Sequence, residues 1–368
     1  MTGQAKLAKA LAATGIDAFL ATSDPAIYYL SGFATNAYER FTGALVLADG
    51  GLRLIVPSLD ARSAAEHAPG VELRSWSDGD DPLELVIDEL RRQGLERGTL
   101  GVEELRMPVA WADRIRSALP SLAVENGGEI LSGLRARKGP GELVRLKAAC
   151  VALSRAFDEL CDRLHAGLTE VEVAVTLAEL IAAAGARVPF QPIVAAGANG
   201  AKPHTTAGDR RLERGNIVVA DASATDGGYF ADITRCFVVG SPSSEQRSVY
   251  EIVRRAQEAA LEALRPGASG GRVDRAARDV IETHGYGPYF VHRTGHGLGV
   301  EVHEAPFLAP GSETVLEEGM VVTVEPGIYL PGSFGIRLED DAVVTANGCE
   351  LLTSAGRDLS ACGGSAGR

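Results

Sequence analysis

The chain has 368 residues, of which 45% are hydrophobic, so it is long enough for two domains that each bury their own core. Its 49 acidic residues outnumber its 36 basic residues and give a formal net charge of −13, without any basic cluster. This charge pattern argues against nucleic acid or an anionic membrane as a partner.

The first third of the chain alternates short apolar runs with segments of helical period, which is typical of an α/β domain. An amphipathic helix is expected first, and Gly15 and Asp17 interrupt it too early for a secretory signal. A further helix is expected to begin at Asp24-Pro25, with the aspartate as its cap. The other expected elements are strands at 16–21, 43–47 and 52–56, and helices at 59–67, 82–93 and 108–119.

A stretch rich in Gly, Arg and Lys over residues 127–140 is the best candidate for a domain boundary. We therefore expect an N-terminal α/β domain over 1–135 and a mixed second domain over 136–368, which makes the chain α+β as a whole. In the second domain, helices are expected at 141–165, 170–184, 244–264 and 273–284, and strands at 190–195, 216–222, 228–239, 320–328 and 341–344.

Two further observations concern the environment of the chain. No run approaches the roughly 18 consecutive apolar residues of a membrane-spanning helix, so a soluble protein is expected. The five cysteines are widely spaced and form no CxxC pair, which predicts reduced thiols and a cytoplasmic location.

Histidines are few and unevenly distributed. Four of the seven lie in motifs dense in glycine and carboxylates: His204, His292, His296 and His303. The other three lie in helical or helix-end contexts, where a structural role is the simpler interpretation. The clustering therefore indicates an active or metal-binding site.

Asp221 follows the apolar run 217–220, and Asp232 lies in the next predicted strand. Ionised carboxylates on adjacent apolar strands need a cation or a hydrogen-bond network, because burial of an unpaired charge is costly. The two aspartates could therefore share metals. The alternative is that both are turn or edge residues.

The segment His292–Glu304, which reads HRTGHGLGVEVHE, contains three imidazoles and glycines that allow backbone to approach a ligand closely. Imidazoles suit Zn, Mn, Fe or Co, and hydrolytic sites with two metals commonly combine them with carboxylates.

Glu325 ends a buried strand just before Pro-Gly, and Glu339 shares a strand face with Arg337. Taken singly, the first could be an exposed strand-end residue, and the second could belong to a solvated, salt-bridged face. Together with Asp221, Asp232 and His296 they form a set of four carboxylates and one imidazole, which favours a pair of Mn²⁺, Co²⁺ or Zn²⁺ ions. A mononuclear iron site with two histidines and one carboxylate is an alternative, but it would leave three carboxylates without a task.

At these residues the chain resembles the pita-bread-fold metallopeptidases, within them the prolidase and aminopeptidase P branch. The motifs are VVADASATDGGYFADITR, HRTGHGLGVEVHE, VEPGIY and GIRLED, and the resemblance covers residues 137–355. The first domain is similar to the creatinase/prolidase-like N-terminal domain of that branch, including the motif AIYYLSGF.

The resemblance implies a role for each site residue. Asp221 would bind one metal and His296 and Glu325 the other, with Asp232 and Glu339 bridging the two; Mn²⁺ is the expected ion, with Co²⁺ or Zn²⁺ as alternatives. Water activated by the metals would attack the scissile carbonyl, and Glu325 would carry a proton to the leaving nitrogen. His303, His292 and His204 would hold the substrate, and Tyr329 and Arg337 would orient the metal-binding carboxylates.

The chain departs from the family pattern at Ser223 and Asp341, and more consequentially at Phe307. Some prolidases have an arginine at the position of Phe307, where it would bind the carboxylate of the proline. In its absence Arg40 or Arg293 would have to supply the cation.

Four functions are known or conceivable for a chain with this resemblance. The leading hypothesis is an Xaa-Pro dipeptidase, because the chain is short, and aminopeptidase P acting on longer Xaa-Pro-Yaa peptides is the main alternative. A metal-free amidinohydrolase of the creatine-degrading type and a non-catalytic binding scaffold share the fold, but all five ligand positions are intact here. The resemblance also implies a homodimer, with the first domain serving substrate access and dimerisation.

Overall fold

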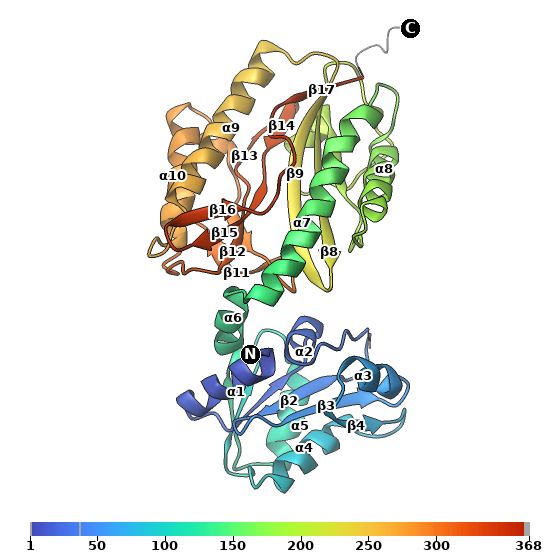
Figure 1. The fold of residues 1–368 in the computed structure, drawn as a ribbon, viewed down its shortest axis with the longest axis vertical. Coiled ribbons are helices and arrows are strands. Elements are labelled where there is room, and N and C mark those ends of the chain that lie inside the picture. The colour runs from blue at the N-terminus through green and yellow to red at the C-terminus, as the bar shows by residue number, and fades with distance from the viewer. Residues whose placement is uncertain (1, 37, 364–368) are drawn as a thin grey trace. The chain divides into compact units, whose positions relative to one another are not determined.

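The computed structural model describes residues 2–36 and 38–363. The chain divides into two compact units, Met1–Arg135 and Ala136–Arg368. Figure 1 shows both units.

The first unit is an α/β domain, as the sequence predicts. Its sheet has the order β4-β3-β2-β1-β5-β6, and every neighbouring pair except β1·β2 and β2·β3 is parallel. The strands are β1 (Ala18–Ala21), β2 (Gly43–Leu47), β3 (Leu52–Pro57), β4 (Glu72–Trp76), β5 (Thr99–Val102) and β6 (Ala123–Asn126). The helices are α1 (Gly3–Thr14), α2 (Asp24–Ser31), α3 (Ala61–His67), α4 (Pro82–Arg92), α5 (Val109–Ala118) and α6 (Gly128–Ala136).

Two details of this unit correct the sequence interpretation. Helix α2 begins at Asp24, but its cap is Ser23, whose side chain accepts a hydrogen bond from the Ala26 amide. The Gly-rich stretch 127–140 is largely helical, because α6 occupies most of it. The boundary between the units therefore lies at the end of a helix.

The second unit places strands between two layers of helices (Figure 1). Its helices are α7 (Pro140–Leu160), α8 (Glu170–Ala183), α9 (Ser244–Ala263) and α10 (Gly270–Thr283), with short 3₁₀ helices η1 (Cys161–Arg163), η2 (Gly197–Ala201) and η3 (Gly287–Tyr289). One sheet has the order β17-β9-β8-β7, a second has the order β11-β10-β12-β15-β16, and β13 pairs with β14 alone. The strands are β7 (Ile193–Ala196), β8 (Ile217–Asp226), β9 (Tyr229–Val239), β10 (Gly295–Gly297), β11 (Glu304–Leu308), β12 (Val321–Val324), β13 (Gly327–Leu330), β14 (Phe334–Arg337), β15 (Asp340–Thr345), β16 (Gly348–Leu351) and β17 (Ser360–Cys362).

Each helix layer packs on the strands through its own hydrophobic cluster. Leu153 and Phe157 of α7 and Leu177 of α8 pack against the four-stranded sheet. Val253 of α9 and Ala277 of α10 pack in a second cluster on the other side. Among the described residues, no helix combines the length and the apolar character that crossing a bilayer requires.

The strands β8 and β9 form the longest hairpin of the unit. Gly227 and Gly228 both have positive φ, and this conformation is the one that a tight two-residue hairpin turn requires. The register pairs Asp221 with Thr234 and Ser223 with Asp232. Asp221 therefore lies within β8, which continues past the expected end at residue 222 to Asp226.

The single strand expected over 320–328 is wrong. The chain forms β12, leaves the sheet at Glu325 and Pro326, and continues in β13, which belongs to a different sheet. Proline has no amide hydrogen to donate to a ladder, so the strand ends there. The break places Glu325 at the end of β12.

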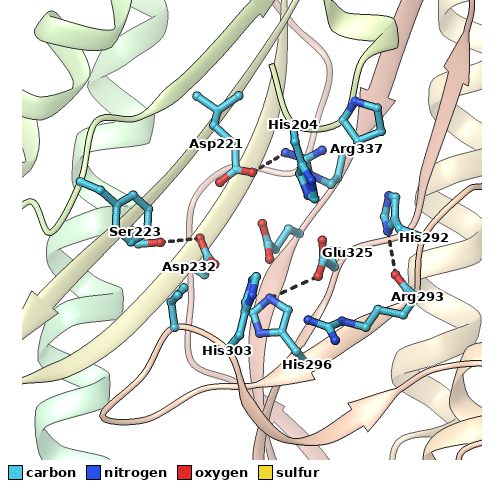
Figure 2. Close-up of a pocket in the computed structure, with 15 residues that line it drawn as sticks. His204, Asp221, Ser223, Asp232, His292, Arg293, His296, His303, Glu325 and Arg337 are labelled. Carbon is cyan, nitrogen blue, oxygen red and sulfur yellow. Dashed lines mark hydrogen bonds and ion pairs between the residues drawn. The ribbon is translucent and has the colours of Figure 1, made fainter. Parts of the chain in front are cut away.

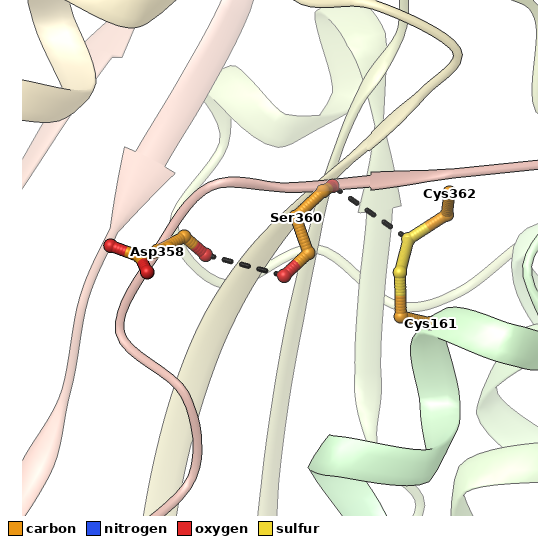
Figure 3. The surroundings of a disulfide bond; sticks show 4 residues. All are labelled: Cys161, Asp358, Ser360 and Cys362. Atoms are coloured by element: carbon orange, nitrogen blue, oxygen red, sulfur yellow. Dashed lines mark hydrogen bonds between the residues drawn. A yellow bond between two sulfur atoms is a disulfide. The ribbon is translucent and has the colours of Figure 1, made fainter. Parts of the chain in front are cut away.

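The expectation that all five cysteines are reduced is also wrong. Cys161 and Cys362 form a disulfide with a Cα–Cα distance of 5.3 Å, which ties η1 to the C-terminal strand β17 (Figure 3). Strand β17 adds in parallel to the edge of β9. The thiols of Cys150, Cys236 and Cys349 are free.

Candidate metal centre

A cavity of about 450 Å³ lies within the second unit, and it gathers the residues that the sequence singled out (Figure 2). All of the predicted site residues except Tyr329 line it: His204, Asp221, Asp232, His292, His296, His303, Glu325, Arg337 and Glu339. Ser223, Arg293 and an apolar wall of Phe190, Ile193, Pro203 and Val302 complete the lining.

Asp232, His296 and Glu339 come closest to a metal-binding geometry. One ligand atom from each lies within 4.8 Å of the others, and all three residues are buried. They come from separate elements: Asp232 from β9, His296 from β10 and Glu339 from the residue before β15. The other two predicted ligands, Asp221 and Glu325, line the same cavity.

Backbone hydrogen bonds fix the two glutamates relative to their neighbours. The Glu325 amide donates to the Thr294 carbonyl at 2.7 Å, and the Glu339 amide donates to the Thr234 carbonyl at 3.2 Å. The Glu339 side chain also accepts from Thr234 Oγ1 at 2.6 Å. Both glutamates are thereby attached to the strands or loops that carry other predicted ligands.

The buried carboxylates of the cavity repel one another. Burial, reinforced by Asp221, raises the pKa of Asp232 well above its usual range, and burial with Asp232 does the same for Glu339. Burial raises the pKa of Glu325 to about 7. A cluster of this kind is stabilised by cations, and oxygen ligands with one imidazole fit divalent metal ions.

His296 presents its lone pair toward the carboxylates. Its Nδ1 donates to the Gly297 carbonyl at 3.1 Å, which leaves Nε2 as the acceptor, 3.3 Å from Glu325 Oε1. Burial lowers the pKa of His296 to about 3, so the ring is neutral. A neutral imidazole with a free Nε2 is the form that binds a metal.

Arg337 is the main counter-charge of the cluster. Its Nη2 forms an ion pair with Asp221 Oδ2, its Nη1 donates to Tyr329 Oη at 2.8 Å, and its Nε donates to Thr234 Oγ1 at 3.0 Å. All three nitrogens of the buried guanidinium are therefore engaged.

Tyr329 lies behind the cavity and links Arg337 to His292. His292 Nδ1 donates to the Arg293 carbonyl at 2.7 Å, so its Nε2 accepts the hydrogen bond from the Tyr329 hydroxyl at 2.8 Å. Burial lowers the pKa of His292 to about 3, which keeps the ring in this neutral state. Both ring nitrogens of His292 are thus engaged within the protein.

The remaining two histidines are placed differently. His303 packs edge-on against His296 with ring centroids 4.0 Å apart, and partial burial lowers its pKa. His204 lines the cavity from the segment after η2 and is exposed to solvent. Both rings are accessible from the cavity.

Sequence reasoning did not identify the side chains that fix the His292 loop. Asp274 of α10 accepts hydrogen bonds from the amide and hydroxyl of Thr294, and Arg278 donates to the carbonyls of Phe290 and His292. Asp274 and Arg278 also pair with each other. Their spacing of four residues on a predicted helix indicates an ion pair, but it does not indicate that the pair binds the loop around His292.

A second unforeseen support is the ion pair between Lys138 and Glu304. The Nζ–Oε1 distance is 2.7 Å, and only 1% of the lysine and 6% of the glutamate side chain are exposed. Glu304 directly follows His303 and begins β11, so the pair anchors the strand beside that histidine.

The two arginines proposed to replace the missing cation have different surroundings. Arg40 lies in the first unit, where its guanidinium pairs with Asp78 and Glu39. Arg293 lines the cavity and stacks on Phe307, with its Cζ 4.5 Å from the ring centroid.

Comparison with known proteins identifies both parts of the chain. A family profile described as metallopeptidase family M24 matches residues 144–346, and one described as the creatinase/prolidase N-terminal domain matches residues 4–137. The Xaa-Pro dipeptidase of Lactobacillus helveticus is 34% identical over 90% of this chain and 91% of its own length.

Solved structures agree with this assignment. A prolidase from Thermococcus sibiricus has a TM-score of 0.91 and 35% identity over 97% of this chain and 98% of its own. An X-Pro aminopeptidase from Thermotoga maritima has a TM-score of 0.90 and 35% identity over 98% of this chain and 100% of its own. The predicted architecture, a creatinase/prolidase-like domain followed by a pita-bread domain, is confirmed.

Proposed function

Because the chain belongs to metallopeptidase family M24, we propose that it hydrolyses the peptide bond between an N-terminal residue and a following proline. The observation that carries the proposal is the single cavity that combines four carboxylates, a metal-competent imidazole and an apolar wall. Relatives named Xaa-Pro dipeptidase span nearly the whole chain and support the same substrate class.

The residues that would hold two divalent metals are Asp221, Asp232, His296, Glu325 and Glu339. When bound, the metals supply Lewis-acid chemistry, which polarises the scissile carbonyl and lowers the pKa of the attacking water. We propose Mn²⁺ as the preferred ion, with Co²⁺ and Zn²⁺ as alternatives, since a ligand set rich in oxygen suits all three.

The protein's own groups would move the protons and hold the substrate. Glu325 is suited to take a proton from the attacking water and deliver it to the proline nitrogen, because its carboxylate lines the cavity beside His296. His303 and His204 face the cavity and would donate hydrogen bonds to the substrate and to the negative charge that develops on its carbonyl oxygen. For His292, whose nitrogens are engaged, we propose that it orients Tyr329 and through it Arg337.

We propose that dipeptides are preferred to longer peptides, and that the first domain contributes to substrate access and to a homodimer. The proposal includes a cytoplasmic location. The wall formed by Phe190, Ile193 and Val302 offers an apolar surface of the kind that a proline ring requires.

A substrate panel on metal-reconstituted protein tests the function. Ala-Pro, Ala-Pro-Ala and the control Ala-Ala should be cleaved in that order of kcat/KM, and the metal-chelated protein should be inactive until Mn²⁺ is returned. Faster cleavage of Ala-Pro-Ala would make the protein an aminopeptidase P, and activity that chelation leaves unchanged would exclude the metal mechanism.

A further inference from the structure

Arg293 is the one cation of the cavity whose guanidinium forms no hydrogen bond or ion pair within residues 2–36 and 38–363, although the charge of Glu325 acts on it. Its side chain is partly buried, and burial lowers its pKa. Arg337, the other arginine of the lining, is fully engaged by Asp221, Tyr329 and Thr234. Figure 2 shows Arg293 pointing into the cavity beside His296 and Glu325.

A partly desolvated guanidinium without a hydrogen-bond partner is energetically costly unless a bound ligand accepts its hydrogen bonds. Its five donors form a planar fork that matches a carboxylate. The cavity therefore contains a free anion-binding group in addition to the metal-binding carboxylates.

Phe307 fixes the position of this group. It lies directly opposite His296 in the antiparallel pairing of β10 and β11, and side chains of directly paired residues lie on the same face of a sheet. The guanidinium of Arg293 stacks on its ring at 4.5 Å, a cation–π contact that restricts the long side chain. The pairing of β10 and β11 that positions His296, a proposed metal ligand, thus also positions Phe307, on which the Arg293 guanidinium stacks.

We propose that Arg293, held on Phe307, binds the free carboxylate of the proline residue and thereby selects Xaa-Pro dipeptides. The proposal rests on the proposed function and specifies its substrate class. With the proline ring against Phe190, Ile193 and Val302, the carboxylate is the only anionic group that the second residue of the substrate offers to the fork. In a longer peptide, the bond to a third residue converts that carboxylate into a neutral amide. The charge-assisted hydrogen bonds to Arg293 are then lost.

The test compares Ala-Pro with Ala-Pro-amide, which differ only in that charge. We expect wild-type protein to prefer Ala-Pro. Arg293→Gln should reduce the ratio of kcat/KM for Ala-Pro to kcat/KM for Ala-Pro-amide on the order of 10- to 100-fold, mainly because the KM of Ala-Pro rises. Arg293→Lys should restore part of the ratio, because it restores the charge but not the fork. Arg265→Gln, an exposed arginine of the same unit, is the matched control.

Two further measurements keep the proposal testable if Arg293→Gln turns over poorly. Phe307→Leu should lower the same ratio about 2- to 5-fold, as expected for a lost cation–π contact. Free proline should raise the melting temperature of the metal-loaded wild type more than prolinamide does, and this difference should vanish in Arg293→Gln.

The outcomes separate the two proposals. If wild-type protein cleaves neither Ala-Pro nor its amide, the proposed function fails. Three results in a protein that cleaves them would overturn the role of Arg293 and leave the proposed function standing. Arg293→Gln could leave the ratio of kcat/KM for Ala-Pro and Ala-Pro-amide unchanged, or lower kcat/KM for both substrates equally. It could also leave the melting-temperature shift caused by proline unchanged.

Discussion

Arg337 Nη2 forms an ion pair with Asp221 Oδ2 across 116 residues of sequence, and the pair joins β14 to β8 at the edge of the metal centre. Arg337 and the proposed metal ions would neutralise the same group of carboxylates. Without metal, most of this task would fall to the Arg337 guanidinium, with a smaller contribution of Arg293 at Glu325.

Replacement of Arg337 tests whether this arginine and metal ions stabilise the same carboxylates. Arg337→Met should destabilise the metal-free protein by about 3–5 kcal/mol at pH 8, because it leaves buried carboxylates without their counter-charge. Mn²⁺ should then raise the melting temperature of the variant by more than that of the wild type. Thermal unfolding with and without Mn²⁺ measures both, and Arg254→Met, which removes exposed ion pairs, is the control. An equal response to Mn²⁺ in both proteins would contradict the idea.

Ser223 should matter to metal affinity although it is not one of the proposed ligands. Its hydroxyl donates to Asp232 Oδ1 at 3.0 Å, so Ser223→Ala should weaken Mn²⁺ binding by about 10- to 100-fold. His296→Ala removes a proposed ligand and should weaken it further. Calorimetric titration with Mn²⁺ gives the affinities, with the exposed Ser248→Ala as reference. Unchanged affinity in His296→Ala would remove that residue from the ligand set.

Glu325 contributes to the pH dependence of the metal-free protein, together with Asp232, Glu339 and Asp341, whose pKa values burial also raises. Burial raises its pKa from an ordinary value of 4.5 to about 7, so the unfolded chain releases this proton at lower pH than the folded protein. The contribution of Glu325 to stability is therefore fully present below about pH 4.5 and is lost as the pH rises through 7. Denaturant unfolding between pH 4.5 and 8 should record this loss, and Glu325→Gln should reduce the slope. A steeper slope in the variant would refute the assignment.

The buried ion pair Lys138–Glu304 should stabilise the protein more than the exposed ion pair Arg137–Glu317, which is its neighbour in sequence. Lys138→Met leaves Glu304 charged and buried and should cost about 3–5 kcal/mol. Arg137→Met breaks an ion pair in which both side chains are more than half exposed and should cost at most about 1 kcal/mol. Urea unfolding of the two variants makes the comparison, and equal losses would show that the burial of the pair is unimportant.

The disulfide should contribute measurably to stability. A bond that closes a loop of about 200 residues typically adds about 2–5 kcal/mol. Dithiothreitol should therefore lower the melting temperature of the wild type to that of Cys161→Ser and leave the variant unaffected. If the reductant leaves the melting temperature of the wild type unchanged, the bond does not form in solution.

The sequence predicts residues that the structure brings together in one cavity, because each of them is marked locally. A carboxylate that follows an apolar run, or a histidine among glycines, is recognisable from its neighbours alone, as at Asp221 and His296. The same logic predicts most helices of the second unit, whose apolar residues repeat at helical spacing, as in α8 and α9.

The connections between segments could not be predicted in this way. Tyr329 meets His292 only because β13 passes behind the loop before β10, and Lys138 meets Glu304 across 166 residues. The stacking of Arg293 on Phe307 depends on the register of β10 and β11, which includes an irregularity after His296. These contacts arise from tertiary packing, and no local pattern in a single sequence records them.

The proposed ligands come from two different sheets. Asp221 and Asp232 belong to the sheet that contains β8 and β9, whereas His296, Glu325 and Glu339 lie on or beside strands of the sheet that contains β10, β12 and β15. The site is complete only after both sheets have formed, and Arg337, Ser223 and Thr234 contact its carboxylates. A change that disturbs either sheet would therefore separate the proposed ligands, even if every one of these residues is kept.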